Sequence, residues 1–148
     1  MQMREQIHSL ILENTEVFDS AFLKIPVTAE RKQQAEQELG FAIPESYLWF
    51  LETYGHGGCF FELLGFGLSG TALFVQETKR QREKGLPAQL MVIENCDEYV
   101  VCIDSQNSNI VSWSSYDQKG TIFKFSCFEE YFLDVLENAI ENFDDEEF

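Results

Sequence analysis

Residues 35–58 read AEQELGFAIPESYLWFLETYGHGG, and they predict two helices joined by a sharp turn. Gly40 ends the first helix, because glycine takes the left-handed backbone conformation of a helix C-terminus without a Cβ clash. Pro44 starts the second helix, where its missing N–H costs nothing. Apolar residues then recur at helical spacing, so one face of this helix must be buried. That face consists of Tyr47, Leu48, Phe50, Leu51 and Tyr54.

Helices are also expected on either side of this stretch. Residues 3–14 place apolar side chains on one helical face, and Thr28 can cap a helix that runs to residue 39. Residues 59–64 combine β-forming residues with flanking glycines, which predicts a strand. Residues 72–84 fit either a strand or a helix. The helix is favoured because acidic and basic side chains recur there at three- and four-residue spacings.

The second half of the chain carries the clearest β pattern. Short apolar segments are separated by turn-rich connectors, and connectors this short join antiparallel neighbours. Ser126 then predicts the cap of a last helix, with Glu129 completing a capping box. The acidic tail, residues 143–148, is expected to fray. The predicted strands are residues 90–94, 99–103, 109–114 and 121–125.

This order of elements predicts an α+β fold in one domain, residues 1–148. We expect N-terminal helices, a mainly antiparallel curved sheet and a C-terminal helix packed on it. The chain is 45% hydrophobic and contains 14 phenylalanines, which is enough for a substantial core. Its N-terminus does not resemble a secretory signal, and its apolar runs fall short of the roughly 20 residues that a membrane helix needs. A cytoplasmic location is therefore expected.

The chain offers little for metal or thiol chemistry. Its histidines are His8 and His56, and its cysteines do not form the close pairs that zinc sites use. We expect no metal and no cofactor, and we expect the thiols to be reduced and inert. The cysteines are Cys59, Cys96, Cys102 and Cys127.

The net charge of −16 is unevenly distributed. Residues 1–85 contain 12 acids and 8 bases, whereas residues 86–148 contain 14 acids and 2 bases. An acidic field repels nucleic acid and anionic membranes, and it attracts basic proteins. Solubility alone is the alternative interpretation. Four of the ten bases gather in one short run, which fits either an exposed helix or a phosphate-binding site, and the overall charge favours the helix. They are Lys79, Arg80, Arg82 and Lys84.

Residues 65–70, GFGLSG, match the dinucleotide-binding fingerprint G-x-G-x-x-G. That motif requires a strand before it and a helix after it, and both are predicted here. The two preceding helices and the hairpin-linked strands argue against a dinucleotide fold. The chain has no Gly-x-Ser-x-Gly elbow. With 26 acids, carboxylate pairs arise by chance, so we expect no enzymatic activity.

The preferred functional feature is an acidic surface with interspersed aromatic side chains. Turn and loop acids follow residue 86, and aromatic residues are enriched at binding hot spots. An ordinary core tryptophan with solvated turn acids is the competing explanation. The candidate partner-binding residues are Glu62, Asp97, Glu98, Tyr99, Asp104, Trp113, Tyr116 and Asp117.

The opening stretch also carries a family pattern, LG-x-x-I-P-x-x-Y-x-x-F-L-x-x-x-G-x-G-G. It resembles the signature of the SUKH superfamily, the Smi/Knr-like proteins. Short apolar matches continue in order over about three quarters of the chain, at residues 63–67, 86–87, 90–93, 102–104, 110–113 and 128–132. His56 departs from the pattern, because many members have an Asn-Gly-Gly stop there. The resemblance implies a single SUKH-like domain and, for many bacterial members, immunity to polymorphic toxins.

Three functional hypotheses follow. The first is an immunity protein that blocks a cognate cytoplasm-acting toxin, with a basic nuclease domain as the partner that the charge favours. The second is a regulatory protein-interaction module, which the fungal Smi/Knr members imply. The third is a small nucleotide-binding protein that uses the glycine loop. None of them predicts whether the chain pairs with itself.

Overall fold

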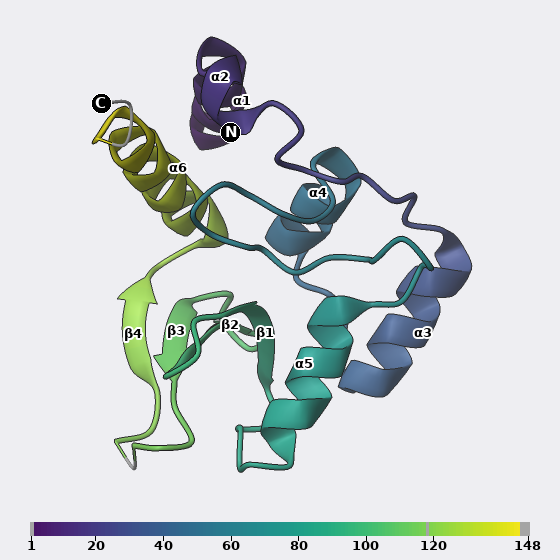
Figure 1. The fold of residues 1–148 in the computed structure, drawn as a ribbon. Coiled ribbons are helices and arrows are strands. Elements are labelled where there is room, and N and C mark those ends of the chain that lie inside the picture. Colours follow the sequence, from purple (N-terminus) through teal and green to yellow (C-terminus); the bar gives the residue numbers. More distant parts are fainter. Residues whose placement is uncertain (1, 118, 146–148) are drawn as a thin grey trace.

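The computed structural model describes residues 2–117 and 119–145. It has the predicted α+β architecture, in which helices come first, an antiparallel sheet follows and a long helix closes the chain (Figure 1). The helices are α1 (Gln2–Glu13), α2 (Thr15–Phe18), α3 (Ala29–Leu39), α4 (Glu45–Thr53), α5 (Leu73–Arg82) and α6 (Phe128–Asp145). The strands are β1 (Leu90–Asn95), β2 (Val100–Asp104), β3 (Ile110–Trp113) and β4 (Ile122–Phe125).

The predicted helix ends around residues 28–44 are confirmed. The Thr28 hydroxyl accepts a hydrogen bond from the backbone N–H of Arg31 at 3.1 Å and caps α3. Gly40 ends α3 with φ 87°, in the left-handed conformation, and Pro44 immediately precedes α4. The Glu36 carboxylate accepts the N–H of Ile43 at 2.9 Å, which fixes the turn between these helices.

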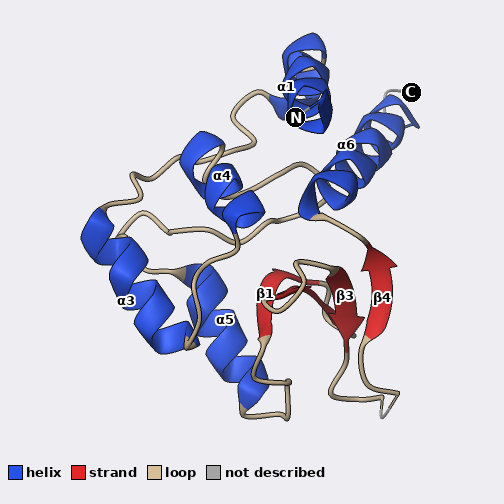
Figure 2. Ribbon diagram, turned by 180° about the vertical axis from the view of Figure 1, so that it is seen from behind, coloured by secondary structure: helices blue, strands red, loops and turns tan. Residues whose placement is uncertain are grey.

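Strand order in the sheet follows chain order, β1-β2-β3-β4, and every pair is antiparallel. The register shifts between Val92 and Glu94 in β1 and again where β4 pairs with β3. Such irregularities increase local twist. The sheet therefore has one edge at β1 and the other at β4 (Figure 2).

One face of the sheet carries the main core, where aromatic rings from distant segments meet. Phe132 of α6 lies edge-on to Phe50 of α4 at 5.3 Å between ring centroids and to Phe22 at 6.2 Å. Tyr47 contacts Phe128 in the same geometry at 5.1 Å. Edge-to-face pairs add stability beyond the area that they bury. The sheet contributes Met91, Ile93, Val101, Ile103 and Ile110 to this core.

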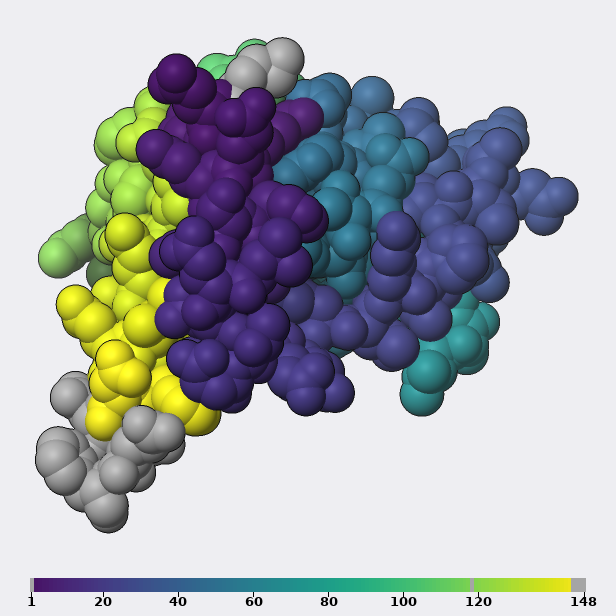
Figure 3. All heavy atoms as spheres, turned by 90° about the horizontal axis from the view of Figure 1, so that it is seen from above, coloured from purple at the N-terminus to yellow at the C-terminus, as the bar shows by residue number. Residues whose placement is uncertain are grey.

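The N-terminal helix packs alongside the C-terminal helix, as the view from above shows (Figure 3). Arg4 of α1 donates to Glu129 of α6 at 2.8 Å and to Glu45 of α4 at 2.7 Å. Its guanidinium also lies 4.8 Å from the ring centre of Trp49. A planar guanidinium suits this combination of bidentate and stacking contacts. One side chain thus joins three helices.

The opposite face of the sheet has a smaller core. It consists mainly of Leu86, Leu90, Val92, Val100, Cys102, Val111 and Trp113. The helix predicted at residues 72–84 is confirmed as α5, and it packs against β1. Thr78, which is fully buried, donates to the carbonyl of Phe74 and accepts the backbone N–H of Val92 at 2.9 Å. The contact gives the Val92 N–H at the buried edge of β1 a hydrogen-bond acceptor, which it would otherwise lack.

The predicted strand at residues 59–64 is wrong. This described segment is irregular and contributes only an isolated bridge, Gly57 to Leu63. Gly57, Gly58 and Phe60 all have positive φ values, which break an extended strand. The Leu64 N–H donates to the carbonyl of Ile93 at 2.8 Å, so the segment lies along the outer side of β1 as a loop.

The start and end of α6 also differ from prediction. Glu129 bonds to Arg4, and the Ser126 hydroxyl donates to Glu130, so the expected capping-box pair of Ser126 with Glu129 is replaced by these contacts. Residues 143–145 of the acidic tail belong to the helix, and Phe143 packs against the core. Residues 146–148 of the tail lie outside the described part, and fraying of the tail stays a prediction.

The glycine loop is shaped by packing within the chain. The Gly65 N–H donates to His56 Nδ1 at 2.9 Å, and the N–H of Gly67 and Gly70 bond to the carbonyls of Thr71 and Gly67. The strand that the dinucleotide motif requires before this loop is missing from the described residues 59–64. These backbone donors are therefore engaged in holding a turn.

Two substitutions in this loop form a matched test. A Cβ at Gly65 would lie 2.0 Å from the carbonyl oxygen of Gly55, whereas a Cβ at Gly67 would make an ordinary 3.6 Å contact with Leu73. We expect Gly65→Ala to lower the free energy of unfolding by about 1–3 kcal/mol. Gly67→Ala should change it by less than about 0.5 kcal/mol. Urea denaturation of both variants measures this, and equal losses would contradict the packing account.

Candidate docking surface

A groove of about 560 Å³ opens where the β1–β2 turn meets the β3–β4 connection. We call it the turn groove. Tyr99 and Tyr116 present large exposed rings here, with 44% and 79% of their surface accessible. Trp113 lies at the side of the groove and is mostly buried. The groove is lined by Glu98, Tyr99, Ser112, Trp113, Ser114, Tyr116, Asp117, Gly120, Ile122 and Lys124.

Hydrogen bonds hold the two loops of the turn groove in place. Asp97 adopts a positive φ of 68°, and its N–H donates to the Asn95 side chain at 2.7 Å. The Ser114 hydroxyl donates to the carbonyl of Glu98 at 2.6 Å and accepts the N–H of Tyr116 at 3.1 Å. Ser114 thereby ties one loop to the other. A surface fixed in this way loses little conformational freedom when it binds a partner.

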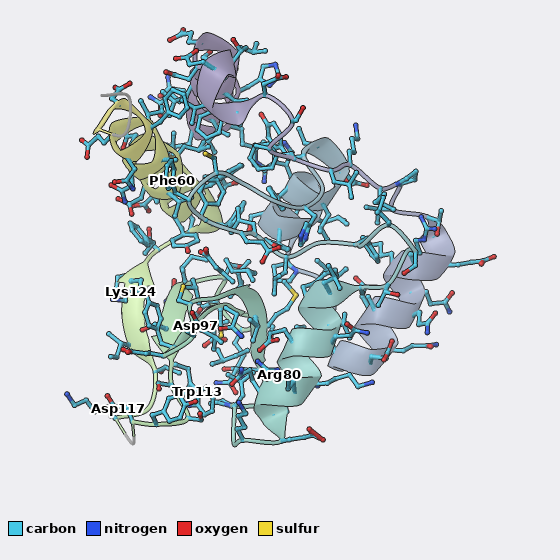
Figure 4. All side chains as sticks on the ribbon, in the orientation of Figure 1. Phe60, Arg80, Asp97, Trp113, Asp117 and Lys124 are labelled. Atoms are coloured by element: carbon cyan, nitrogen blue, oxygen red, sulfur yellow. The ribbon has the colours of Figure 1, made fainter. Side chains whose placement is uncertain are left out.

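The structure brings most of the predicted candidate residues together, but two lie elsewhere. Asp97 stands next to the turn groove, in a smaller hollow that shares Glu98 and Tyr99 with it (Figure 4). Asp104 pairs with Leu90 at the far end of β2. Glu62 bonds through its carboxylate to His56 at 3.1 Å. Those lining the groove are Glu98, Tyr99, Trp113, Tyr116 and Asp117.

The charge around the turn groove is mixed. Arg80 and Lys84 of the α5 segment share the small hollow with Asp97 and Glu98 (Figure 4), and Lys124 lines the groove itself. These bases are near the acids because α5 packs against β1, a contact that the sequence pattern did not specify. The predicted acidic surface therefore includes basic side chains at this site.

The basic run on α5 makes contacts within the chain. Lys79 pairs with Glu38 at 2.7 Å, and Arg80 pairs with Glu77 at 3.0 Å. Arg82 donates to the carbonyl of Leu39 at 2.7 Å, so it completes the C-terminal end of α3. These contacts support the interpretation of the run as a helix surface rather than a phosphate site.

A second groove, of about 580 Å³, lies between β4 and α6. We call it the helix groove. Phe60 and Phe61 border it from the loop after α4, and Lys124 comes from β4. Asp134 and Glu141 line its α6 side. Sequence reasoning did not identify this site. The available signal was the acidic face of the last helix, which has seven acids and no base in residues 128–145.

A buried carboxylate forms part of the helix groove. Glu94 is 8% exposed, accepts a hydrogen bond from the Tyr131 hydroxyl and accepts the backbone N–H of Glu62 at 2.9 Å. Burial raises the pKa of Glu94, and the hydrogen bonds from Tyr131 and Glu62 partly offset this rise. Burial likewise raises the pKa of Tyr131. The pair fixes α6 against β1.

The site offers shape and charge rather than activated nucleophiles. Burial raises the pKa of the Cys96 thiol to about 11 and raises that of Cys102 as well, so both are uncharged at neutral pH. Among the described residues, no group of three or more His, Cys, Asp and Glu side chains could hold a metal ion. Over the same residues, none of the helices combines the length and the apolar character that crossing a membrane requires.

Comparison with known families gives one informative match. The family model SUKH_5, described as SMI1-KNR4 cell-wall, matches residues 7–137. The match begins in α1 and ends within α6, so it includes the whole sheet and both grooves, apart from four residues at the α6 end of the helix groove.

The buried Glu94 predicts a pH-dependent stability. Because its pKa is raised in the folded protein, the stabilisation from its neutral form is complete below the unfolded pKa, about 4.3, and is lost as pH rises through the folded pKa. Glu94→Gln stays neutral; its amide oxygen can accept the Glu62 N–H, and its amide nitrogen can donate to the Tyr131 hydroxyl. We expect its free energy of unfolding to fall less than that of the unsubstituted protein between about pH 4 and pH 7.

Urea denaturation at a series of pH values measures this difference. Glu141→Gln is the matched control, because it removes an exposed carboxylate of the same groove. Parallel pH profiles for the unsubstituted protein and Glu94→Gln would contradict the assignment of Glu94.

Proposed function

Because the chain belongs to the SUKH family of SMI1-KNR4 proteins, we propose that it is an immunity protein. It binds the toxic domain of a cognate toxin in the cytoplasm and blocks it in a stoichiometric complex. The family match supports a protein-interaction role of this kind. The toxin partner, its activity and the binding face are part of the proposal.

The observation that carries the proposal is the turn groove. Its exposed tyrosines stand beside a mostly buried tryptophan, with Glu98 and Asp117 at the rim. Large aromatic side chains supply contact area at low entropic cost, and they dominate many protein interfaces. The hydrogen-bonded loops present these rings in a fixed arrangement. Such a surface suits a protein partner.

The net charge of −16 supports a basic partner. A nuclease domain must present lysine and arginine to phosphate groups, so an acidic protein can occupy that site or its rim. Because the turn groove contains both acids and bases, it can form salt bridges with both basic and acidic residues of the partner. The long-range field remains negative and increases the rate of encounter with a basic partner. Inhibition is then steric and electrostatic, without turnover. Protection of the producing cell calls for nanomolar affinity, about −12 kcal/mol.

A regulatory module that binds a host protein is the second candidate. The SMI1-KNR4 cell-wall description of the matching family favours it. The two candidates use the same kind of docking surface but differ in partner. Genome context separates the two candidates. A neighbouring gene for a toxin with a variable C-terminal domain favours the immunity protein, because a regulatory module does not need such a neighbour.

Charge reversal tests the role of the turn groove. We expect the triple variant Asp97→Lys, Glu98→Lys and Asp117→Lys to associate roughly tenfold more slowly with a catalytically inactive form of the neighbouring toxin domain at low salt. The difference should shrink as salt rises, because exposed charges are screened. Surface plasmon resonance at several salt concentrations measures the rate.

Asp104→Lys provides the control, because it changes the charge at the opposite end of β2. The control changes the net charge by 2 and the triple variant changes it by 6, so the effects are compared per unit of charge as changes in the logarithm of the association rate. We expect a clearly smaller effect per unit of charge for Asp104→Lys. Equal effects per unit of charge would assign the rate to net charge alone, and an unchanged rate in the triple variant would remove the turn groove from the interface.

A further inference from the structure

The two edges of the sheet differ, because one is covered by other segments and the other is open. The β1 edge is covered, since the Leu64 N–H pairs with the carbonyl of Ile93 and the Thr78 hydroxyl accepts the N–H of Val92. The β4 edge has β3 on one side, and within the described residues no other strand pairs with it (Figures 1 and 2). One edge of this sheet is therefore open to another chain.

The open edge is unusually apolar. Ile122 is 47% exposed and Phe123 is 60% exposed, and they stand next to each other in β4. Proteins usually protect an exposed edge with charged residues, bulges or a covering segment, because its unpaired backbone groups can pair with another strand. Lys124 at the register shift is the charged residue within β4. An exposed aromatic and an exposed β-branched residue favour strand pairing.

We infer that β4 receives an extended, basic segment of the partner protein as a fifth strand of the sheet. Main-chain hydrogen bonds along β4 hold the segment, and alternate side chains point to the two faces of the sheet. Phe123 pairs with Val111, and Phe125 pairs with Ile110. The register shift at Lys124 therefore places the two phenylalanines on opposite faces of the sheet. The added side chains meet Phe123 on one face and the helix groove next to Phe125 on the other. The inference rests on the proposed function, because it takes a protein partner as given.

The charge beside this edge selects a basic segment. Helix α6 follows β4 directly and contains seven acids and no base. Asp134 and Glu141 line the helix groove, where Lys124 is the basic residue. Lysine or arginine side chains of an added strand would reach these carboxylates, whereas acidic ones would be repelled. The apolar borders of the groove, Phe60 and Phe61, suit the aliphatic part of such side chains.

A second copy of the chain fits this edge less well. Pairing of β4 with β4 would bring together two molecules of charge −16, each with its acidic α6 next to the shared edge. Like charges at close range oppose association. The segment is therefore assigned to a basic partner and not to self-association.

The test uses the unsubstituted protein and a synthetic probe peptide. The probe is a seven-residue capped peptide of alternating lysine and isoleucine. The comparison peptide has the same sequence with backbone N-methyl groups on alternate residues, which preserve its charge but remove hydrogen-bond donors. We expect the probe to shift the backbone amide resonances of residues 122–125. The methylated peptide should bind at least about tenfold more weakly, since several main-chain hydrogen bonds are lost.

Substitutions in the edge strand give a second readout. Ile122→Thr and Phe123→Thr keep a strand-forming, uncharged residue but remove exposed apolar area, and each should weaken binding of the probe by about fivefold or more. Leu68→Thr is the matched control, because Leu68 is 84% exposed in the glycine loop, outside both grooves. It should leave binding unchanged.

Four outcomes would overturn the inference. Equal binding of the two peptides would show charge attraction without strand pairing, and unshifted resonances at residues 122–125 would place the probe elsewhere. A dimer in sedimentation analysis that Phe123→Thr dissociates would assign the edge to a second copy. A protein that binds the probe at β4 but fails to neutralise the toxin keeps this inference and loses the proposed function. If Ile122→Thr and Phe123→Thr leave neutralisation of the toxin unchanged, the proposed function is kept and this inference is lost.

Discussion

The packing of Phe132 against Phe50 and Phe22 is the interaction on which the rest of the structure depends. These rings come from α6, α4 and the connection before α3, so they gather helices from both ends of the chain over one face of the sheet. Arg4 reinforces the same junction from α1. With that face covered by helices, the loops at the sheet end and the β4 edge remain accessible to other molecules.

Local patterns in the sequence predicted much of this fold. Thr28, Gly40 and Pro44 determine helix ends through their own backbone and side-chain chemistry, so their effect is visible without tertiary information. The short connectors between the apolar segments after residue 90 predicted an antiparallel sheet, because a parallel pair needs a long crossover. The strand expected at residues 59–64 failed because positive φ values at Gly57, Gly58 and Phe60 override the β preference of the side chains.

The candidate site was less predictable, because it depends on contacts between distant segments. Glu98 and Asp117 lie in the turn groove with Tyr99 and Trp113, because the β1–β2 turn and the β3–β4 connection stand at the same end of the sheet. Asp104 lies apart because consecutive connections of a meander lie at opposite ends of the sheet, and Asp104 stands at the β2–β3 connection. Arg80 was not expected near Asp97, since only the packing of α5 on β1 brings them together.

The central claim is that this SUKH-family protein acts by occupying a partner and not by chemistry on a substrate. The most direct measurement is a titration of the proposed toxin domain, encoded by a neighbouring gene, with the purified protein. The titration follows toxin activity and the mass of the complex together. The account predicts a linear loss of activity that is complete at one equivalent, with a one-to-one complex in sedimentation. Inactivation by a small fraction of an equivalent, which requires turnover, or full toxin activity at a large excess would contradict it.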